Sequence, residues 1–241
     1  MQQFDTTFDA VFAANHLELY ASEQNKQTYR ALCEHILEVN KIHNLTAIRD
    51  VPGMITKHIA DSLTIAPHIP QGASLIDVGT GGGFPTLPLA VARPDLHITA
   101  IDSTGKKIAH VQSTAQKFNL SNVTAMTARA EDLAQTEYRE HFDVATARAV
   151  SELRILCEIT LPFVKIGGIL IAMKGASGKK ELADAQNAIC KLGGTLVSEH
   201  YVPLKDAAGN QDGRWLFIIQ KKSHTPNNFP RQYSQIMKKP L

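Results

Sequence analysis

A glycine-rich turn is the stretch of this sequence with the clearest chemistry. The segment Leu75–Pro85 reads Leu-Ile-Asp-Val-Gly-Thr-Gly-Gly-Gly-Phe-Pro, and an apolar segment follows it. A short apolar run, a glycine-rich turn and a proline predict a strand, a tight connection and a helix. Glycines permit positive φ and let a ligand approach bare backbone, and a helix start offers unpaired N–H donors. The turn therefore predicts a nucleotide-like cofactor, although a simple tight connection would also use these residues.

The spacing of the glycines distinguishes between cofactors. The dinucleotide fingerprint needs glycine at the first, third and sixth positions of the turn, and the sixth position here is Phe84. The pattern present is acidic-x-Gly-x-Gly-x-Gly, formed by Asp77, Gly79, Gly81 and Gly83. It resembles the turn of Rossmann-like methyltransferases that depend on S-adenosylmethionine.

Polar residues also stand where the following strands are expected to end. Asp102 closes an apolar run, where a carboxylate can accept both ribose hydroxyls of an adenosine or cap the next helix. The turn that contains Glu131 flanks the adenine edge in this fold. Arg148 follows the next run and can meet the methionine carboxylate, an RNA phosphate or a structural partner. Lys174 ends a further run near the same rim. Ligands of such sheets bind at the carboxyl ends of the strands, so these residues are expected to converge.

The elements that must position these residues are read from alternating apolar patterns. Seven strands are expected near residues 73–78, 97–102, 122–126, 142–147, 167–173, 195–204 and 214–221. Helical stretches separate the first five, which predicts parallel strands with right-handed crossovers and helices on both faces. The last two are expected to form a hairpin. We predict an α/β protein with the Rossmann-like class I S-adenosylmethionine-dependent methyltransferase fold: a seven-stranded, mostly parallel sheet with an N-terminal helical cap.

The N-terminal part is predicted to be helical. Ser22 can cap a helix whose apolar residues recur at spacings of three and four. Asp50, followed by Pro52, can cap a second helix. We divide the chain into a helical cap over 1–70, a methyltransferase domain over 71–222 and a basic C-terminal tail over 223–241.

Composition restricts the class of protein. Of the 241 residues 44% are hydrophobic and 20% charged, which is ordinary for a soluble globular protein, and the net charge is only +2. Any nucleic-acid surface must therefore be local. Cys33, Cys157 and Cys190 are far apart and odd in number, which indicates reduced thiols rather than disulfides or a zinc site. No membrane helix or export signal is expected, and we predict a cytoplasmic protein with no metal.

Two basic segments are candidates for RNA contact. Residues 221–241 contain five lysines and arginines and no acid, with Phe229 and Tyr233 between them as possible stacking residues. A disordered, solubilising tail would have a similar composition. Lys106 and Lys107 begin a predicted helix near the cofactor and would meet phosphates or simply face solvent. Because the pocket is expected to be built from residues 77–148, deleting the tail is expected to leave cofactor affinity nearly unchanged.

A resemblance to a known family adds to this interpretation. The motifs that carry it, in chain order, are Asn44-Leu-Thr46, His58-Ile-Ala-Asp-Ser-Leu63, Asp77-Val-Gly-Thr-Gly-Gly-Gly-Phe-Pro85, Asp102-Ser-x-Gly-Lys-Lys107, Arg129-Ala-Glu131, Thr146-Ala-Arg-Ala149 and Met173-Lys-Gly175. Together they resemble the RsmG family, also called glucose-inhibited division protein B, over roughly residues 24–241. The resemblance implies methylation of guanine N7 in the 530 loop of bacterial 16S ribosomal RNA, with S-adenosylmethionine as the cofactor.

The resemblance and the strand ends together give two expected sets of residues. The cofactor set is Asp77, Gly79, Gly81, Gly83, Phe84, Asp102, Ala130, Glu131 and Arg148. The substrate set is Asn44, His58, Lys106, Lys107, Lys174, Arg231, Lys238 and Lys239. His58 and Asp61 lie one helical turn apart and are expected to order the pocket entrance. Thr86 departs from the family, in which many members have glycine there. The expected partner is 16S ribosomal RNA in the 30S subunit or an assembly intermediate, bound by a monomer.

The residues that the chain lacks agree with N7 chemistry. Amino-group methylation commonly uses an Asp/Asn-Pro-Pro-aromatic motif, which is absent after the fourth predicted strand. Cys157 lies inside a predicted helix, where core packing is its simplest role. Guanine N7 carries a free lone pair and no proton, so positioning suffices and no catalytic residue is expected. A small-molecule methyltransferase and an RNA-binding module without activity remain alternatives, whereas Phe84 disfavours a dinucleotide oxidoreductase.

Overall fold

A single mixed sheet forms the centre of the molecule. The computed structural model describes residues 2–241. Its strands are β1 (Ser74–Val78), β2 (His97–Asp102), β3 (Val123–Thr127), β4 (Phe142–Arg148), β5 (Val164–Lys174), β6 (Gly194–Lys205) and β7 (Gln211–Lys221). The spatial order is β3-β2-β1-β4-β5-β7-β6, with β1 to β5 parallel and β7 antiparallel to both of its neighbours. The predicted fold class is confirmed, and β5 begins a few residues earlier than expected.

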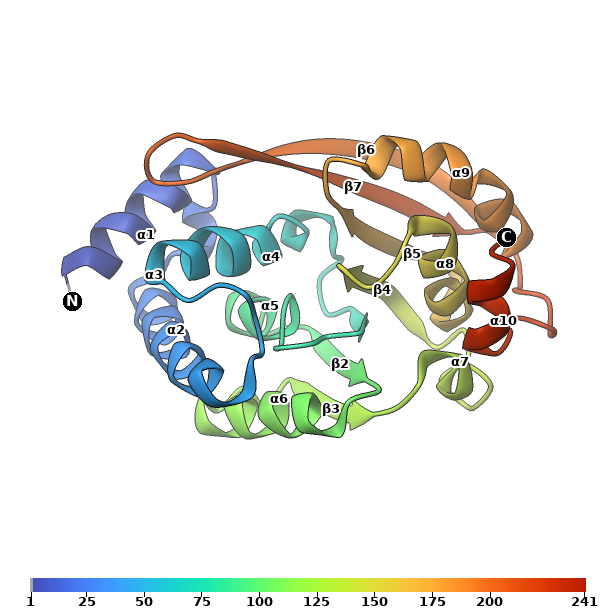
Figure 1. The fold of residues 1–241 in the computed structure, drawn as a ribbon, viewed down its shortest axis with the longest axis horizontal. Helices are drawn as coiled ribbons and strands as arrows, with labels where there is room; N and C mark the ends of the chain where they lie inside the picture. The colour runs from blue at the N-terminus through green and yellow to red at the C-terminus, as the bar shows by residue number, and fades with distance from the viewer. Residues whose placement is uncertain (1) are drawn as a thin grey trace.

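Helices cover both faces of the sheet (Figure 1). Those after β1 are α5 (Thr86–Ala92), α6 (Gly105–Lys117), α7 (Ala130–Leu133), α8 (Leu153–Thr160), α9 (Gly178–Lys191) and α10 (Tyr233–Lys238). The side chains of β1 alternate between two apolar clusters: Leu75 packs with α5 and α6, and Ile76 packs with α8 and α9. A strand buried on both faces needs apolar residues at successive positions, which explains the continuous apolar run before the glycine turn.

The N-terminal helices pack on one of these faces. They are α1 (Gln2–Ala14), α2 (Glu23–His43), and a continuous helical stretch made of α3 (Val51–Gly53), the wider η2 (Met54–Ala60) and α4 (Asp61–Leu63). Short 3-10 turns lie at η1 (Glu18–Tyr20), η3 (Ala66–His68) and η4 (Leu161–Phe163). Both predicted caps are present: Ser22 Oγ accepts from Asn25 N at 3.2 Å, and Asp50 Oδ1 accepts from Gly53 N at 2.7 Å. The buried rings of Phe8 and Tyr29 join the apolar cluster that contains Leu75.

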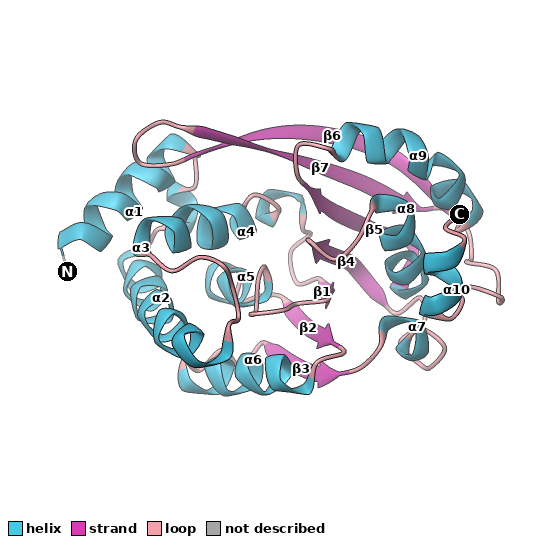
Figure 2. Cartoon of the chain, in the orientation of Figure 1, coloured by secondary structure: helices cyan, strands magenta, loops and turns pink. Residues whose placement is uncertain are grey.

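The segment after β7 is folded onto the opposite face, against α7 and α8. Lys221, which has no exposed surface, donates to Leu161 O at 2.8 Å and to Thr225 Oγ1 at 2.6 Å. Arg139 donates to the carbonyls of Thr225 and Phe229 at 2.7 and 2.9 Å. Figure 2 shows α10 beside α8, so this part of the chain belongs to the folded domain. Within residues 2–241, none of the helices has both the length and the apolar character needed to cross a membrane.

Candidate functional site

Two neighbouring cavities lie at the carboxyl ends of the parallel strands, where the topology changes direction. The first, of about 330 Å³, lies beside the ends of β2 and β3, and the second, of about 490 Å³, lies between β4, β5 and the N-terminal cap. Gly79, Lys107 and Ala149 line both cavities. Ligands of open α/β sheets bind at this crevice. The glycine turn therefore separates two compartments of one site.

The glycines of the turn serve different purposes. Gly79, Gly81 and Gly83 all have positive φ, of +74°, +58° and +93°. A Cβ on Gly79 would lie 2.7 Å from Val150 Cγ2, and one on Gly83 would lie 2.5 Å from Leu87 Cδ1. A Cβ on Gly81 would meet only a backbone oxygen at 3.9 Å, because this residue faces the second cavity. Gly83 is thus required for packing, whereas Gly81 leaves space for a ligand.

Asp77 lies beneath the turn rather than in either cavity. It is fully buried, and its Oδ2 accepts from Thr86 Oγ1 at 2.7 Å. Thr80 Oγ1 donates in turn to Thr86 Oγ1 at 3.1 Å. Burial raises the pKa of Asp77 to about 6, although the hydroxyl bonds oppose this shift. Asp77 and Thr86, the two residues singled out from the sequence at this turn, therefore form one buried contact that joins β1 to the start of α5.

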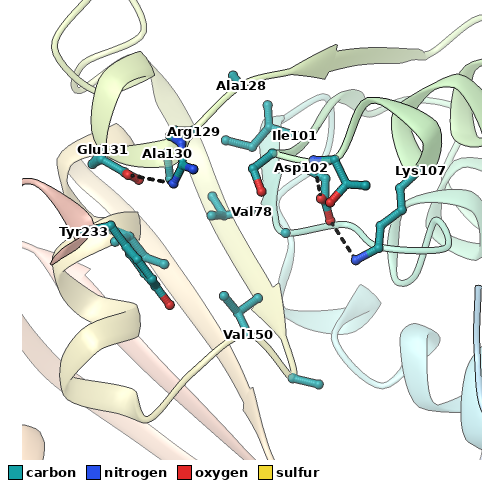
Figure 3. Close-up of a pocket in the computed structure, with 15 residues that line it drawn as sticks. Val78, Ile101, Asp102, Lys107, Ala128, Arg129, Ala130, Glu131, Val150 and Tyr233 are labelled. Atoms are coloured by element: carbon teal, nitrogen blue, oxygen red, sulfur yellow. Dashed lines mark hydrogen bonds and ion pairs between the residues drawn. The ribbon is translucent and has the colours of Figure 1, made fainter. Parts of the chain in front are cut away.

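Asp102 lines the first cavity at the end of β2. Its Oδ2 accepts from Gly81 N at 3.1 Å, and its Oδ1 accepts from Thr104 N at 2.8 Å. Lys107 Nζ lies 3.6 Å from Oδ2. The carboxylate thus orders both the glycine turn and the turn into α6 while its side chain borders the cavity (Figure 3). The two roles considered from the sequence, a ribose acceptor and a local cap, are compatible.

Apolar side chains and a second carboxylate also line the first cavity. Ala130 and the buried Glu131 come from the start of α7, and Arg129 Nη1 lies 3.6 Å from Glu131 Oε1. The apolar lining comprises Val78, Ile101, Ala128, Val150 and Ile159, together with the ring of Tyr233 from α10. The expectation that the pocket is built only from residues 77–148 is wrong, because α8 and α10 also contribute. The cavity thus combines apolar side chains with polar groups, among them the carboxylates of Asp102 and Glu131, as small-molecule sites do.

Arg148 lines the second cavity and contacts several of its other residues. Its Nη1 donates to Asp61 Oδ2 and to Lys57 O, both at 2.8 Å. On the other side of Asp61, Arg214 Nε lies 3.3 Å from Oδ1. Asp61 is almost completely buried and therefore pairs with arginines from β4 and β7 at once. Arg214 Nη1 also lies 2.9 Å from Asp212 Oδ1, so two arginines and two carboxylates form one ion-pair network beside this cavity.

His58 joins this cluster as a neutral ring. Its Nδ1 accepts from Arg148 Nη2 at 3.0 Å, since a guanidinium can only donate. The proton therefore sits on Nε2, which is 2.6 Å from Thr46 Oγ1. Burial and then the charge of Arg148 lower the pKa of His58 to about 3. The ring is stacked on Phe84 with centroids 4.2 Å apart, and both of its nitrogens are engaged in hydrogen bonds.

The predicted substrate residues are divided between the site and the surface. Lys174 lines the second cavity, where its Nζ contacts Ser151 O and Glu181 Oε2 at 2.6 Å each. Asn44 ends α2 with a positive φ and lies outside the lining, whereas its neighbours Leu45 and Thr46 are part of it. Five of the predicted substrate residues line neither cavity: Asn44, Lys106, Arg231, Lys238 and Lys239.

Arg231 is engaged in a structural ion pair. Its Nε and Nη2 donate to the two carboxylate oxygens of fully buried Glu158 at 2.8 and 2.6 Å, and its backbone N donates to the same group at 3.0 Å. The guanidinium also binds Lys239 O at 3.0 Å. These contacts connect the C-terminal segment to α8. Lys238 and Lys239 remain exposed.

Sequence reasoning missed several residues of the site. Arg214 lies on β7 and reaches Asp61 only because the β6–β7 hairpin is paired alongside β5. Tyr233 was considered only as a possible RNA-stacking residue. Neither position has a local motif that would have revealed its contacts. Cys157 lines neither cavity, and burial raises the pKa of its thiol to about 12, which leaves it without a nucleophilic role.

Comparison with known proteins agrees with this geometry. Residues 25–206 match the family model described as rRNA small subunit methyltransferase G. Ribosomal RNA small subunit methyltransferase G of Leuconostoc citreum is 43% identical over 236 residues, which cover 96% of this chain and 97% of the relative. The chain belongs to this family. The Streptococcus pyogenes serotype M1 member of the methyltransferase G family is 41% identical and covers 91% of this chain and 93% of its own. The family expected from the sequence motifs is confirmed.

Solved structures show the same fold. An O-methyltransferase from Bacillus cereus in complex with SAH matches with a TM-score of 0.56 at 19% identity, over 79% of this chain and 91% of its own. M. jannaschii TYW2 in complex with AdoMet matches with a TM-score of 0.55 at 16% identity, over 68% of this chain and 76% of its own. The predicted cofactor of this chain, S-adenosylmethionine, is confirmed.

Proposed function

We propose that this protein methylates N7 of a guanine in the 530 loop of 16S ribosomal RNA. Bound S-adenosylmethionine supplies an electrophilic methyl group on its sulfonium. The cofactor residues proposed from the sequence, Gly79, Gly81 and Asp102 among them, border the first cavity or the turn next to it. Arg148 is proposed to hold the carboxylate of the cofactor, because it is the cation that β4 delivers to the glycine turn.

The observation that supports N7 is the absence of a free base in the second cavity of the described chain. His58 has both nitrogens bonded, Asp61 is paired with two arginines, and Glu181 is paired with Lys174. An amino nitrogen or a hydroxyl must lose a proton when it is methylated, whereas N7 attacks through its lone pair. A site that positions its ligands without abstracting a proton therefore favours N7.

Charge supports a polyanionic substrate. Lys57, Lys107, Lys174 and Arg214 accompany Arg148 around the second cavity, although the protein as a whole carries a charge of only +2. We therefore propose that the substrate strand approaches over this cavity and that its phosphates meet these cations. We further propose that the protein acts as a cytoplasmic monomer on the 30S subunit or on an assembly intermediate.

Methyl transfer from labelled S-adenosylmethionine tests the proposal. The protein is incubated with 30S subunits, protein-free 16S RNA or total RNA lacking this methylation, and the labelled nucleotide is mapped. We expect one labelled guanine in the 530 loop and a single-turnover rate without an essential base ionisation between about pH 6 and 9. Replacement of that guanine by 7-deazaguanine should abolish transfer. Labelling of the 7-deaza substrate, or of a small molecule without RNA, would overturn the assignment.

A further inference from the structure

The C-terminal segment forms part of the first cavity. Tyr233, the first residue of α10, lines it together with Glu131 and Val150, on the opposite side from Asp102 (Figure 3). Among the described residues that line this cavity, Tyr233 supplies the one aromatic ring. It lies outside residues 25–206, the part of the chain that matches the family model. Its contribution is therefore not implied by the family match.

The position of Tyr233 is fixed by contacts on both sides of it along the chain. Before it, Arg231 is paired with buried Glu158, and Phe229 is almost completely buried. After it, Ile236 has no exposed surface and packs in the apolar cluster of α8. Buried contacts fix the chain on both sides of this ring. A ligand that contacts the ring therefore causes little further loss of conformational entropy.

The chemistry of the cavity indicates what this ring contacts. Asp102 offers its carboxylate to ribose hydroxyls at one side, so the base of the same nucleoside lies toward the other side. There the apolar lining consists of Ala130, Val150, Ile159 and the ring of Tyr233, and the carboxylate of Glu131 lies beside it. A purine has a flat π-face that stacks on aromatic side chains. We propose that the ring of Tyr233 packs against the adenine of S-adenosylmethionine, which makes the C-terminal segment a component of the cofactor site.

The hydroxyl of Tyr233 is not needed for this contact. Within residues 2–241 no hydrogen bond of this hydroxyl to another side chain or to the backbone is present, and the side chain is only partly buried. A phenylalanine would therefore preserve the stacking surface. Met237, one turn further along α10, provides a matched control because it is 51% exposed and does not line the first cavity.

Isothermal titration calorimetry of the full chain with S-adenosylmethionine and with S-adenosylhomocysteine tests the proposal. For Tyr233→Ala the Kd of both ligands should rise about 5- to 150-fold, the loss expected for one base–aromatic stack. Tyr233→Phe and Met237→Ala should keep the wild-type Kd. Circular dichroism and thermal unfolding are measured on each variant, and Tyr233→Leu supplies a second, well-packed substitution if the alanine variant does not fold.

Three results would overturn the proposal. The first is an unchanged Kd for folded Tyr233→Ala or Tyr233→Leu. The second is an equal loss for Met237→Ala, which would indicate a general disturbance of α10. The third is an unchanged cofactor Kd combined with weaker binding of a 530-loop RNA fragment by Tyr233→Ala, which would assign the ring to the RNA instead. Because both ligands bind without methyl transfer, the measurement does not depend on which RNA atom is methylated.

Discussion

Replacement of Arg231 by alanine tests whether this residue serves the fold or the RNA. The substitution leaves the fully buried carboxylate of Glu158 without the two hydrogen bonds from the Arg231 side chain, while the backbone N of residue 231 can still donate to it. Breaking a buried ion pair from one side costs about 3–5 kcal/mol. Arg231 keeps 22% of its side chain exposed, so water moderates the loss. We expect the lower end of this range, about 3 kcal/mol of the free energy of unfolding.

This loss is large enough to measure directly. For a domain of this size, about 3 kcal/mol corresponds to a fall in Tm of about 6–12 °C. Lys238→Ala, which removes an exposed cation from the same segment, should change stability by less than about 0.5 kcal/mol. Urea and thermal unfolding of the three proteins provide the comparison. A stability of Arg231→Ala equal to that of the wild type, together with a flatter salt dependence of RNA binding, would refute the structural role and restore a phosphate contact.

Further predictions concern the cofactor site and pH. Gly81→Val should abolish S-adenosylmethionine binding in calorimetry while the protein stays folded, because the added branches enter the second cavity; unchanged binding would contradict the role of the turn. Asp102→Ala should raise the Kd about 10- to 150-fold, from the loss of charged hydrogen bonds worth about 1.5–3 kcal/mol. The pKa of His58 is lowered to about 3 in the folded protein. As the pH falls, the unfolded chain therefore binds a proton at this histidine at a higher pH than the folded protein does. Stability should therefore fall as the pH drops from about 6.5 toward 3, and His58→Gln should show a weaker dependence in urea unfolding; an identical dependence would argue against a buried neutral ring.

Local patterns were sufficient for most of the fold. The central strands carry their own apolar runs, and the turn at Gly79–Gly83 needs positive φ that glycine supplies, so both could be predicted from neighbouring residues. The helix caps at Ser22 and Asp50 are equally local, because the capping atom and its donor are three residues apart. The local sequence was therefore sufficient to predict the glycine turn and the two helix caps.

The contacts that could not be predicted join distant parts of the chain. Asp77 has the type and position of a ligand-binding acid, but its neighbour in space is Thr86, and only the three-dimensional turn reveals that the pair is buried. Arg231 lies in a basic segment whose composition also describes an RNA-binding tail. Its partner Glu158 is 73 residues away, and nothing in either local sequence indicates the pairing. Side-chain roles set by such long-range contacts cannot be obtained from periodicity.

The pairing of Glu158 with Arg231 also has a consequence for biosynthesis. Because a ribosome adds about 5–20 residues per second, the 73 residues between them separate the two side chains by about 4–15 s. During that interval α8 carries a carboxylate that the finished protein buries completely. The face of the nascent sheet that holds α8 therefore cannot close in its final form until the chain has been made past Arg231. The opposite face, which contains α2 and α5, is built largely from residues that are synthesised earlier.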